Sequence, residues 1–298
     1  MYKVIKPALA AIFIFLVSAA SAQQTLRDRI SILARPANGV VGVSVLDLED
    51  RDTVNYNGSS RMVMQSVMKF PIAMTVLHMV DSGVFTLDRV VHIRKSDMPL
   101  KDGGPLIQKY PKGGAVTISE LLTDMVSYSD NNACDILLDY LSDDGPGDVM
   151  NYLHSIKIKG VNVSATEQDM AKAWELQYTD WCKPVDMAKL LDAFYNKKVL
   201  SQTSKDFLYK IMTETTTGPN RIKGLLPAGT VVAHKTGSSA TNEAKLTPAT
   251  NDVGIITLPN GKHVAIAIFV CNSTADDTTR DLVIANIAKA VYDYEVKK

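Results

Sequence analysis

The sequence has few cysteines and no clustered histidines, and both shortages exclude classes of protein. Its 298 residues include three cysteines, Cys134, Cys182 and Cys271, without CxxC spacing. Such an odd, sparse set is not a disulfide scaffold, so we expect buried free thiols, although one pair could form after export. The five histidines show no HxH or HExxH spacing, which argues against a metalloenzyme. We therefore expect no metal and no cofactor.

The sequence also has no excess of positive or of negative charge. The chain carries 32 Lys and Arg against 32 Asp and Glu, a formal net charge of zero. Without a broad basic field, a nucleic-acid partner is not expected. The composition, 46% hydrophobic and 21% charged, is that of a globular protein with a sizeable core.

The N-terminus has the pattern of a secretory signal peptide over residues 1–22. Lys3 and Lys6 precede an apolar run from Ala8 to Val17, and Ala20-Ser21-Ala22 fits a cleavage box. The run is shorter than the ~20 residues of a membrane span, which disfavours an anchor. Cleavage would leave 30 basic against 32 acidic residues. We expect a periplasmic or secreted protein without stable membrane association.

Strand patterns lie towards both ends of the chain, and helical patterns fill the middle. Residues 40–48 and three segments between 230 and 272 are β-branched and apolar, and Pro259-Asn260-Gly261 signals a hairpin. Helical spacing dominates from 66 to 209 and again from 278 to 296. This predicts an α+β fold, with an antiparallel sheet from both termini flanked by helices and an inserted all-helical lobe. The sheet lobe would comprise 23–60 and 215–298, and the helical lobe 61–214, as one catalytic unit.

A lysine lies inside the apolar segment QSVMKFPIAMTVLHMV, residues 65–80. Residues three apart share a helix face, so Lys69 can approach the hydroxyl of Ser66. A lysine in apolar surroundings gives up its proton more readily and can activate a serine nucleophile. Pro71 suits a first helical turn, which would put Ser66 at the helix N-terminus, where free N–H groups favour negative charge. Alone, this spacing often occurs by chance.

Two further short motifs follow in order. The SDN run at 129–131 interrupts two helical stretches and could be only a helix cap. The KTG run at 235–237 follows a strand pattern and could be only a solvated edge strand. Its Lys and Thr suit carboxylate recognition, and its Gly allows a close approach. Each motif is weak alone, whereas the ordered set is specific.

SxxK, SDN and KTG in this order resemble the serine β-lactamase and penicillin-binding family. Glu167 resembles the glutamate that activates water for deacylation in class A β-lactamases, although a surface glutamate is the alternative. A penicillin-binding protein keeps its acyl-enzyme, whereas a β-lactamase needs a base and a water to cleave it. The resemblance therefore implies a class A serine β-lactamase, of the PER/VEB-like extended-spectrum subgroup. Such an enzyme would hydrolyse β-lactam antibiotics, cephalosporins included.

The resemblance also implies the catalytic roles. Ser66 would attack the lactam carbonyl, and Lys69 and Glu167 would share the work of the general base. Ser129 would relay a proton to the leaving nitrogen. The backbone N–H groups of Ser66 and Ser238 would form the oxyanion hole.

The substrate-binding residues are implied in the same way. Asn131 would bind the side-chain amide of the substrate, and Lys235 and Thr236, followed by Gly237, would hold its carboxylate. Arg221 would either reach the carboxylate site from a neighbouring strand or be a plain surface arginine. The ligand would be one small β-lactam molecule, and we expect a monomer.

Several positions depart from the common class A pattern. Asp135 and Ala171 stand where many members have asparagine. Gly103, followed by Gly104, stands where the cleft rim usually has an aromatic residue. Gln65 and the stretches SDNNACD and HKTGSS resemble the PER/VEB-like subgroup, in which the glutamate loop is altered and the cleft enlarged. These departures leave the substrate spectrum open.

Two other functions remain compatible with the motifs. One is a D-Ala-D-Ala peptidase or penicillin-binding protein acting on peptidoglycan, and the other is a non-hydrolytic penicillin-sensing domain. Sustained turnover of a chromogenic cephalosporin would distinguish a hydrolase from both, because they would give a single burst.

Overall fold

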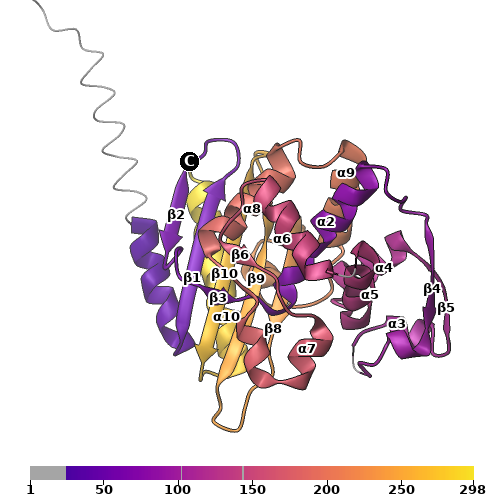
Figure 1. Ribbon diagram of the computed structural model, residues 1–298. Coiled ribbons are helices and arrows are strands. Elements are labelled where there is room, and N and C mark those ends of the chain that lie inside the picture. Colours follow the sequence, from indigo (N-terminus) through magenta and orange to yellow (C-terminus); the bar gives the residue numbers. More distant parts are fainter. Residues whose placement is uncertain (1–24, 102, 143) are drawn as a thin grey trace, which may run out of the picture.

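The computed structural model describes residues 25–101, 103–142 and 144–298 (Figure 1). The expected signal peptide, residues 1–22, lies outside these ranges. Within them, no helix combines the length and the apolar character needed to cross a bilayer.

The central sheet joins strands from the two ends of the chain. Its order is β2-β1-β10-β9-β8, and every neighbouring pair is antiparallel. β1 pairs with β10 from Val40 opposite Cys271 to Asp47 opposite Val264. This confirms the expected α+β fold with a sheet from both termini. The strands are β1 Val40–Asp47, β2 Thr53–Tyr56, β8 Val232–Ser238, β9 Thr247–Thr257 and β10 His263–Ser273.

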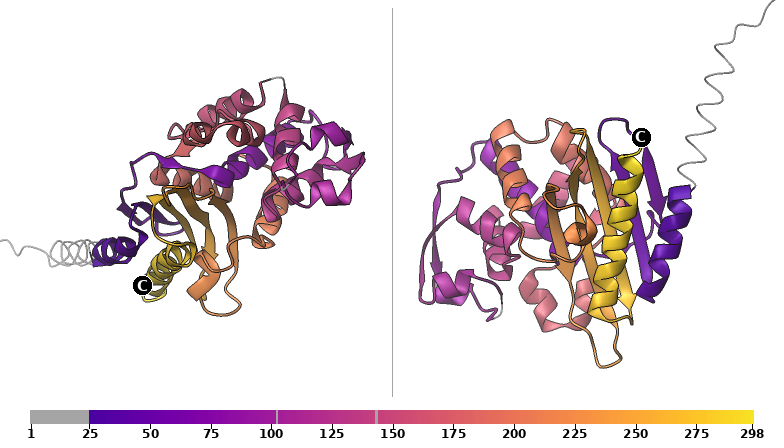
Figure 2. Two further views of the ribbon diagram at one scale, coloured as in Figure 1. Left: turned by 90° about the horizontal axis from the view of Figure 1, so that it is seen from below. Right: turned by 180° about the vertical axis from the view of Figure 1, so that it is seen from behind.

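Both faces of the sheet are buried, because successive side chains of a strand point to opposite sides. Along β10, Ile266 and Ile268 belong to one hydrophobic core and Ala267 and Phe269 to the other. The first core is covered by α10, Asp277–Glu295, and by the helix over residues 25–34, which lie side by side on this face in Figure 2.

The remaining helices cover the other face and extend beyond it (Figure 1). They are α2 Lys69–Asp81, α3 Leu106–Lys109, α4 Ile118–Ser127, α5 Asn131–Leu141, α6 Gly145–Ser155, α7 Glu167–Lys172, α8 Pro184–Asn196 and α9 Gln202–Thr213. α8 packs on β1 and β10 of the sheet. The predicted helical lobe, residues 61–214, therefore includes one helix that covers the sheet. We keep the two-lobe division as a proposal, with α8 as the element that joins the lobes.

Short strands and 3₁₀ turns connect these helices. The short strands are β3 Met62–Val63, β4 Val90–Arg94, β5 Gly113–Thr117, β6 Val161–Asn162 and β7 Trp181–Cys182. The 3₁₀ turns are Arg35–Ala37, Gln65–Met68, Lys95–Asp97, Trp174–Tyr178 and Ile222–Leu225. β3 leads directly into the turn that carries Ser66. It pairs with β7, which directly follows the segment that contains Glu167, residues 164–180, called the glutamate segment below.

α2 is the central helix of the helical side, in contact with α4, α5, α6 and α9. Its apolar residues from Phe70 to Leu77 are buried, as the run from 65 to 80 predicts, and Met79 and Val80 are half-buried. Cys134, Cys182 and Cys271 are all buried and unpaired, which confirms the expected free thiols.

Candidate active site

Ser66 lies at the junction between β3 and α2. It is the second residue of the 3₁₀ turn Gln65–Met68, and Lys69 is the first residue of α2. Pro71 is therefore in the first turn of α2, where its missing N–H leaves no hydrogen bond unmade. The Lys69 Nζ donates to Ser66 Oγ at 2.9 Å. The SxxK spacing thus gives the contact that it predicts.

The surroundings of the Lys69 amine are more polar than the sequence suggests. The side chain is fully buried, but its Nζ meets four oxygens from three separate segments. These are Ser66 Oγ at 2.9 Å, the Ser129 carbonyl oxygen at 3.0 Å, Asn131 Oδ1 at 2.5 Å and Glu167 Oε1 at 2.6 Å. The amine is therefore surrounded by oxygen atoms, although it belongs to a helix whose other buried side chains are mostly apolar. Its surroundings are not purely apolar.

Glu167 is buried and begins a short helix. The resemblance implies that this glutamate lies in a loop, and within that segment Glu167 is the first residue of the six-residue helix α7. Thr166 caps that helix, accepting from the Asp169 N–H at 3.1 Å while the Asp169 carboxylate reaches back to the Thr166 N–H. This capping box satisfies early N–H groups of the helix and fixes where it begins. The glutamate is thus held on a defined turn.

Asp135 explains how the first turn of α7 is attached to the helical side. Its Oδ1 accepts from the Glu167 N–H at 2.8 Å and its Oδ2 from the Gln168 N–H at 2.9 Å. An asparagine would offer only one oxygen here, so the departure at 135 matches two N–H donors. Burial raises the pKa of Asp135 to about 6. Ala171 is exposed on α7.

Asp180 connects the last residue of the glutamate segment to its first residues. The sequence analysis did not identify it. Its Oδ1 accepts from the N–H groups of Ser164 at 2.7 Å and Ala165 at 3.1 Å. Its own carbonyl oxygen accepts from the Met64 N–H at 2.9 Å, next to the nucleophile turn. Burial raises the pKa of Asp180 to about 6. No short motif marks this residue, because its partners lie far away in the sequence.

The SDN run serves both as a helix cap and as part of the site. Asp130 is the N-cap of α5, accepting from the Ala133 N–H at 2.8 Å, as the simpler interpretation holds. Ser129 precedes it with a φ of 62°, a left-handed conformation that is uncommon for serine. Its Oγ accepts from Lys235 Nζ at 2.9 Å. Ser129 therefore lies between the two buried lysines of the site.

The KTG run lies on β8, at the edge of the sheet, as expected. Burial, together with the charge of Lys69, holds the pKa of Lys235 well below its usual value. A Cβ on Gly237 would lie 2.3 Å from the Met64 carbonyl oxygen, so only glycine fits. The sequence predicted a close approach here, and the approaching group is the backbone before the nucleophile. This contact brings β8 beside Ser66.

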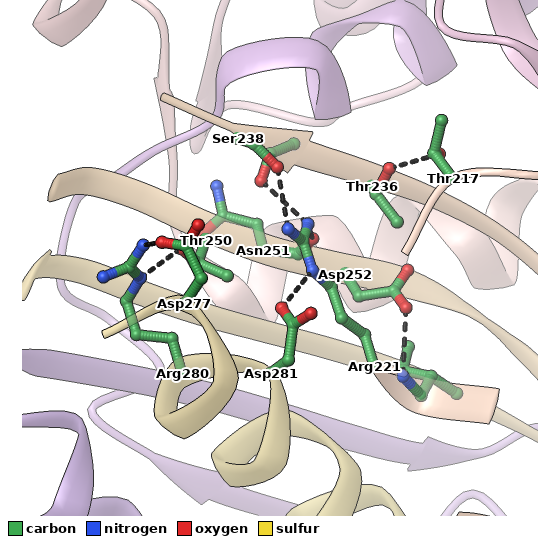
Figure 3. Close-up of polar contacts among 12 residues, drawn as sticks. Thr217, Arg221, Thr236, Ser238, Thr250, Asn251, Asp252, Asp277, Arg280 and Asp281 are labelled. Atoms are coloured by element: carbon green, nitrogen blue, oxygen red, sulfur yellow. Dashed lines mark hydrogen bonds and ion pairs between the residues drawn. The ribbon is translucent and has the colours of Figure 1, made fainter. Parts of the chain in front are cut away.

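Arg221 lies on the turn before Ile222–Leu225, so the expected neighbouring strand was wrong. Figure 3 shows its guanidinium beneath β8 and β9. It donates to Ser238 Oγ at 2.8 Å, to the Asn251 carbonyl oxygen at 2.9 Å and to Asp281 Oδ1 at 2.8 Å. In the same view Thr236 faces Thr217, with their Oγ1 atoms 2.6 Å apart. Arg221 is buried, unlike a plain surface arginine.

The rim departure at Gly103 and Gly104 has a steric reason. A Cβ on Gly104 would lie 2.4 Å from Asp130 Oδ2, and its φ of 134° suits glycine alone. A Cβ on Gly103 would lie 2.4 Å from Asn132 Nδ2, and its carbonyl oxygen accepts from the Asn131 N–H at 2.5 Å. The backbone here lies directly against the SDN segment, so no side chain fits in this conformation.

His234 and Asp252 form a buried pair behind the site, with Nδ1 and Oδ1 2.9 Å apart. Asp252 also accepts from the Ile222 N–H at 3.1 Å, which joins the turn after Arg221 to the sheet. His234 directly precedes Lys235 on β8. Its contacts favour packing that holds β8 and β9 in register.

Comparisons with known proteins agree with this geometry. A family model described as the β-lactamase enzyme family matches residues 24–295. β-Lactamase VEB-1 of Pseudomonas aeruginosa is 39% identical over 97% of this chain and 97% of its own length. The extended-spectrum β-lactamase PER-1 of the same organism is 38% identical over 100% and 98%.

Solved structures show the same similarity. A β-lactamase from Chitinophaga pinensis superposes with a TM-score of 0.89 and 44% identity, over 91% of this chain and 99% of its own. TLA-3 extended-spectrum β-lactamase superposes with a TM-score of 0.90 and 44% identity, over 92% and 99%.

Proposed function

The chain belongs to the β-lactamase enzyme family, as a serine enzyme of class A, and we propose that it hydrolyses β-lactams through an acyl-enzyme on Ser66. Cephalosporins are among the proposed substrates. The observation that carries the proposal is the position of Lys69 Nζ, 2.9 Å from Ser66 Oγ and 2.6 Å from Glu167 Oε1. One amine thus connects a nucleophile to a carboxylate, and the same carboxylate can later activate water.

Acylation begins with removal of the hydroxyl proton of Ser66. Glu167 takes a proton from Lys69, and Lys69 takes the Ser66 proton as Oγ bonds to the lactam carbonyl carbon. The N–H groups of Ser66 and Ser238 stabilise the resulting oxyanion. The groups on this proton path are already close, with a hydrogen bond between Lys69 and Ser66 and an ion pair between Lys69 and Glu167.

The lactam C–N bond then breaks, and the nitrogen takes the hydroxyl proton of Ser129. Lys235, 2.9 Å from Ser129 Oγ, returns a proton to Ser129. The proton that Glu167 took at the start passes back through Lys69 to Lys235, so Glu167 becomes ionised again. The lowered pKa of Lys235 makes its proton easier to donate. The same lysine, with Thr236, attracts the substrate carboxylate.

Deacylation is the step that separates a hydrolase from a penicillin-binding protein. Glu167 takes a proton from water as the water oxygen attacks the ester carbonyl carbon, and the Ser66 oxygen then leaves with the proton that Glu167 returns through Lys69. Support for this role comes from the burial of Glu167, its ion pair with Lys69 and its attachment through Asp135. A carboxylate held so firmly beside the nucleophile is what turnover requires.

The substrate class and the location follow from the same features. Gly103 and Gly104 leave the rim without a bulky side chain, which suits β-lactams with large acylamide groups. VEB-1 and PER-1 are similar over nearly the whole chain, and PER-1 is described as extended-spectrum. With the predicted signal peptide, we propose a monomer exported to the periplasm or the medium.

The test is a rapid-mixing experiment with a chromogenic cephalosporin in large excess over the protein. A hydrolase gives sustained turnover, whereas one equivalent of product followed by a plateau would refute the proposal and favour a penicillin-binding protein. Parallel runs with a penicillin and a carbapenem define the spectrum. We expect turnover of the penicillin and the cephalosporin to exceed that of the carbapenem.

A further inference from the structure

The backbone before the nucleophile is held in an unfavourable conformation. Gln65, directly before Ser66, has a φ of 48°, which few non-glycine residues adopt. Such conformations persist only where surrounding contacts determine them. On its N-terminal side, Met64 donates its N–H to the Asp180 carbonyl oxygen at 2.9 Å and accepts from Asn251 Nδ2 at 3.1 Å.

The side chain of Gln65 makes a further contact, to the glutamate segment. Its Nε2 donates to Gln177 Oε1 at 2.8 Å, and Gln177 Nε2 donates to the Trp174 carbonyl oxygen at 2.8 Å. Gln177 is 4% exposed and lies in the 3₁₀ turn Trp174–Tyr178, which follows α7. Both polar atoms of the Gln177 amide therefore form hydrogen bonds. Its Nε2 donates within its own turn, and its Oε1 accepts from the nucleophile turn.

We propose that Gln177 is a positioning residue for deacylation, which acts by fixing the glutamate segment against the nucleophile turn through Gln65. This inference rests on the proposed function and adds a residue to it. The segment from 164 to 180 is attached to the nucleophile side at Asp180 by a backbone bond and at Gln177 by this side-chain pair. Glu167 lies near the start of this segment, before the residue Gln177 that makes the side-chain contact.

The two chemical steps depend on this contact to different degrees. Ser66 and Lys69 lie on one continuous turn, so their 2.9 Å contact persists when the glutamate segment loosens. The distance from Glu167 to the ester carbon instead depends on where that segment lies. Small errors in such a distance slow a reaction strongly. Loss of the pair should therefore slow deacylation more than acylation.

The expected kinetic signature is specific. When deacylation limits turnover, slowing it lowers kcat and KM together and leaves kcat/KM, which reports acylation, nearly unchanged. Loss of one neutral hydrogen bond should lower kcat by about three- to tenfold. The acyl-enzyme should accumulate to a higher fraction at steady state. A purely structural defect would instead reduce the active fraction, and so lower kcat with KM unchanged.

The experiment compares Gln65→Met, Gln177→Met and the double variant with the parent enzyme. Methionine keeps the length of glutamine without its hydrogen-bonding groups. Gln202→Met is the matched control, because Gln202 is exposed and makes a comparable side-chain bond to Asp206. Steady-state kinetics, the acyl-enzyme fraction by quenched mass spectrometry and the thermal midpoint are measured for each. The active fraction comes from the burst amplitude.

We expect both single variants to lower kcat and KM together. The double variant should lose no more than Gln177→Met alone, because Gln177→Met already removes both the bond from Gln65 and the bond to the Trp174 carbonyl oxygen. Gln65→Met, at a partly exposed site, keeps the test informative if Gln177→Met folds poorly. An equal fall in kcat and kcat/KM, or multiplicative losses in the double variant, would overturn the inference. Absence of turnover in the parent enzyme would instead refute the proposed function.

Discussion

Asp135→Asn tests how the glutamate is held, and it should change stability and activity in opposite directions. The Asp135 carboxylate accepts the N–H groups of Glu167 and Gln168 within the protein, and the charges that face it are those of Glu167 and Lys69. Burial dominates and raises its pKa from 3.8 to about 6. A carboxyl group with a raised pKa takes up its proton more readily in the folded protein than in the unfolded chain.

The magnitude follows from linkage. A shift of about two pKa units corresponds to about 3 kcal/mol at pH values well above 6. The contribution of Asp135 to stability is fully present below the unfolded pKa and is lost as pH rises through the folded pKa. Asparagine carries no charge and has no such loss. Asp135→Asn should therefore raise the free energy of unfolding by about 2 kcal/mol near neutral pH, which is the linkage gain less about 1 kcal/mol for the hydrogen bond that asparagine loses. Near pH 4, where the linkage gain is small, the variant should be no more stable than the parent protein.

The expected effect on turnover has the opposite sign. Asparagine presents one oxygen and one NH₂ group, so one of the two N–H groups at the start of α7 would face a donor. Losing that bond should displace Glu167 and slow deacylation by about tenfold, at about 1.4 kcal/mol. The residue would then favour activity over stability, as strained active sites often do.

The assay is urea unfolding at several pH values between about 4 and 8, together with single-turnover deacylation. Asp206→Asn is the control, since Asp206 also lies on a helix, α9, and its side chain is exposed. Asp180 remains in both proteins, so its own titration cancels in the difference. A difference in stability between the variant and the parent protein that does not grow from pH 4 to pH 8 would show that burial of the charge is not what raises the pKa of Asp135.

The remaining predictions concern the chemistry and the rim. Glu167→Gln should leave acylation measurable and trap the acyl-enzyme by mass spectrometry; unchanged steady-state turnover would rule out its role as the deacylating base. Ser66→Ala should abolish covalent labelling by penicillin, and peptide mapping that finds label on another serine would contradict the assignment. Gly104→Ala should lower the free energy of unfolding by about 3 kcal/mol, because its Cβ would meet Asp130 and its φ is unfavourable. Gly83→Ala, with a φ of 75° and open space around it, is the control and should lose only about 1 kcal/mol; equal losses would exclude the contact.

Local patterns in the sequence were enough for much of the site. The Ser66–Lys69 contact is a relation between residues three apart, which any helical turn would bring together. The strands of the sheet were predictable because a sheet buried on both faces needs continuous apolar runs, and β10 is such a run. Asp130 as an N-cap followed from the chemistry of a short polar residue before a helix.

Other features required contacts that no local pattern encodes. The capping box of Thr166 and Asp169 is a local pattern that could have predicted where α7 begins, whereas the attachment of Glu167 through the two oxygens of Asp135 could not be predicted from local sequence. Arg221 could be read as exposed, whereas Ser238 and Asp281 surround its guanidinium. In each case the partner lies far away along the chain.

The sequence by itself determined the reacting groups, their order and the alternation of strands and helices, because these depend on residue type and short spacing. The tertiary structure alone decided that Lys69 would meet Glu167, that Gln65 would meet Gln177, and that only glycine would fit at 104 and 237. Those outcomes arise where separate backbones approach closely, and the distance between two backbones is set by the packing of the whole core.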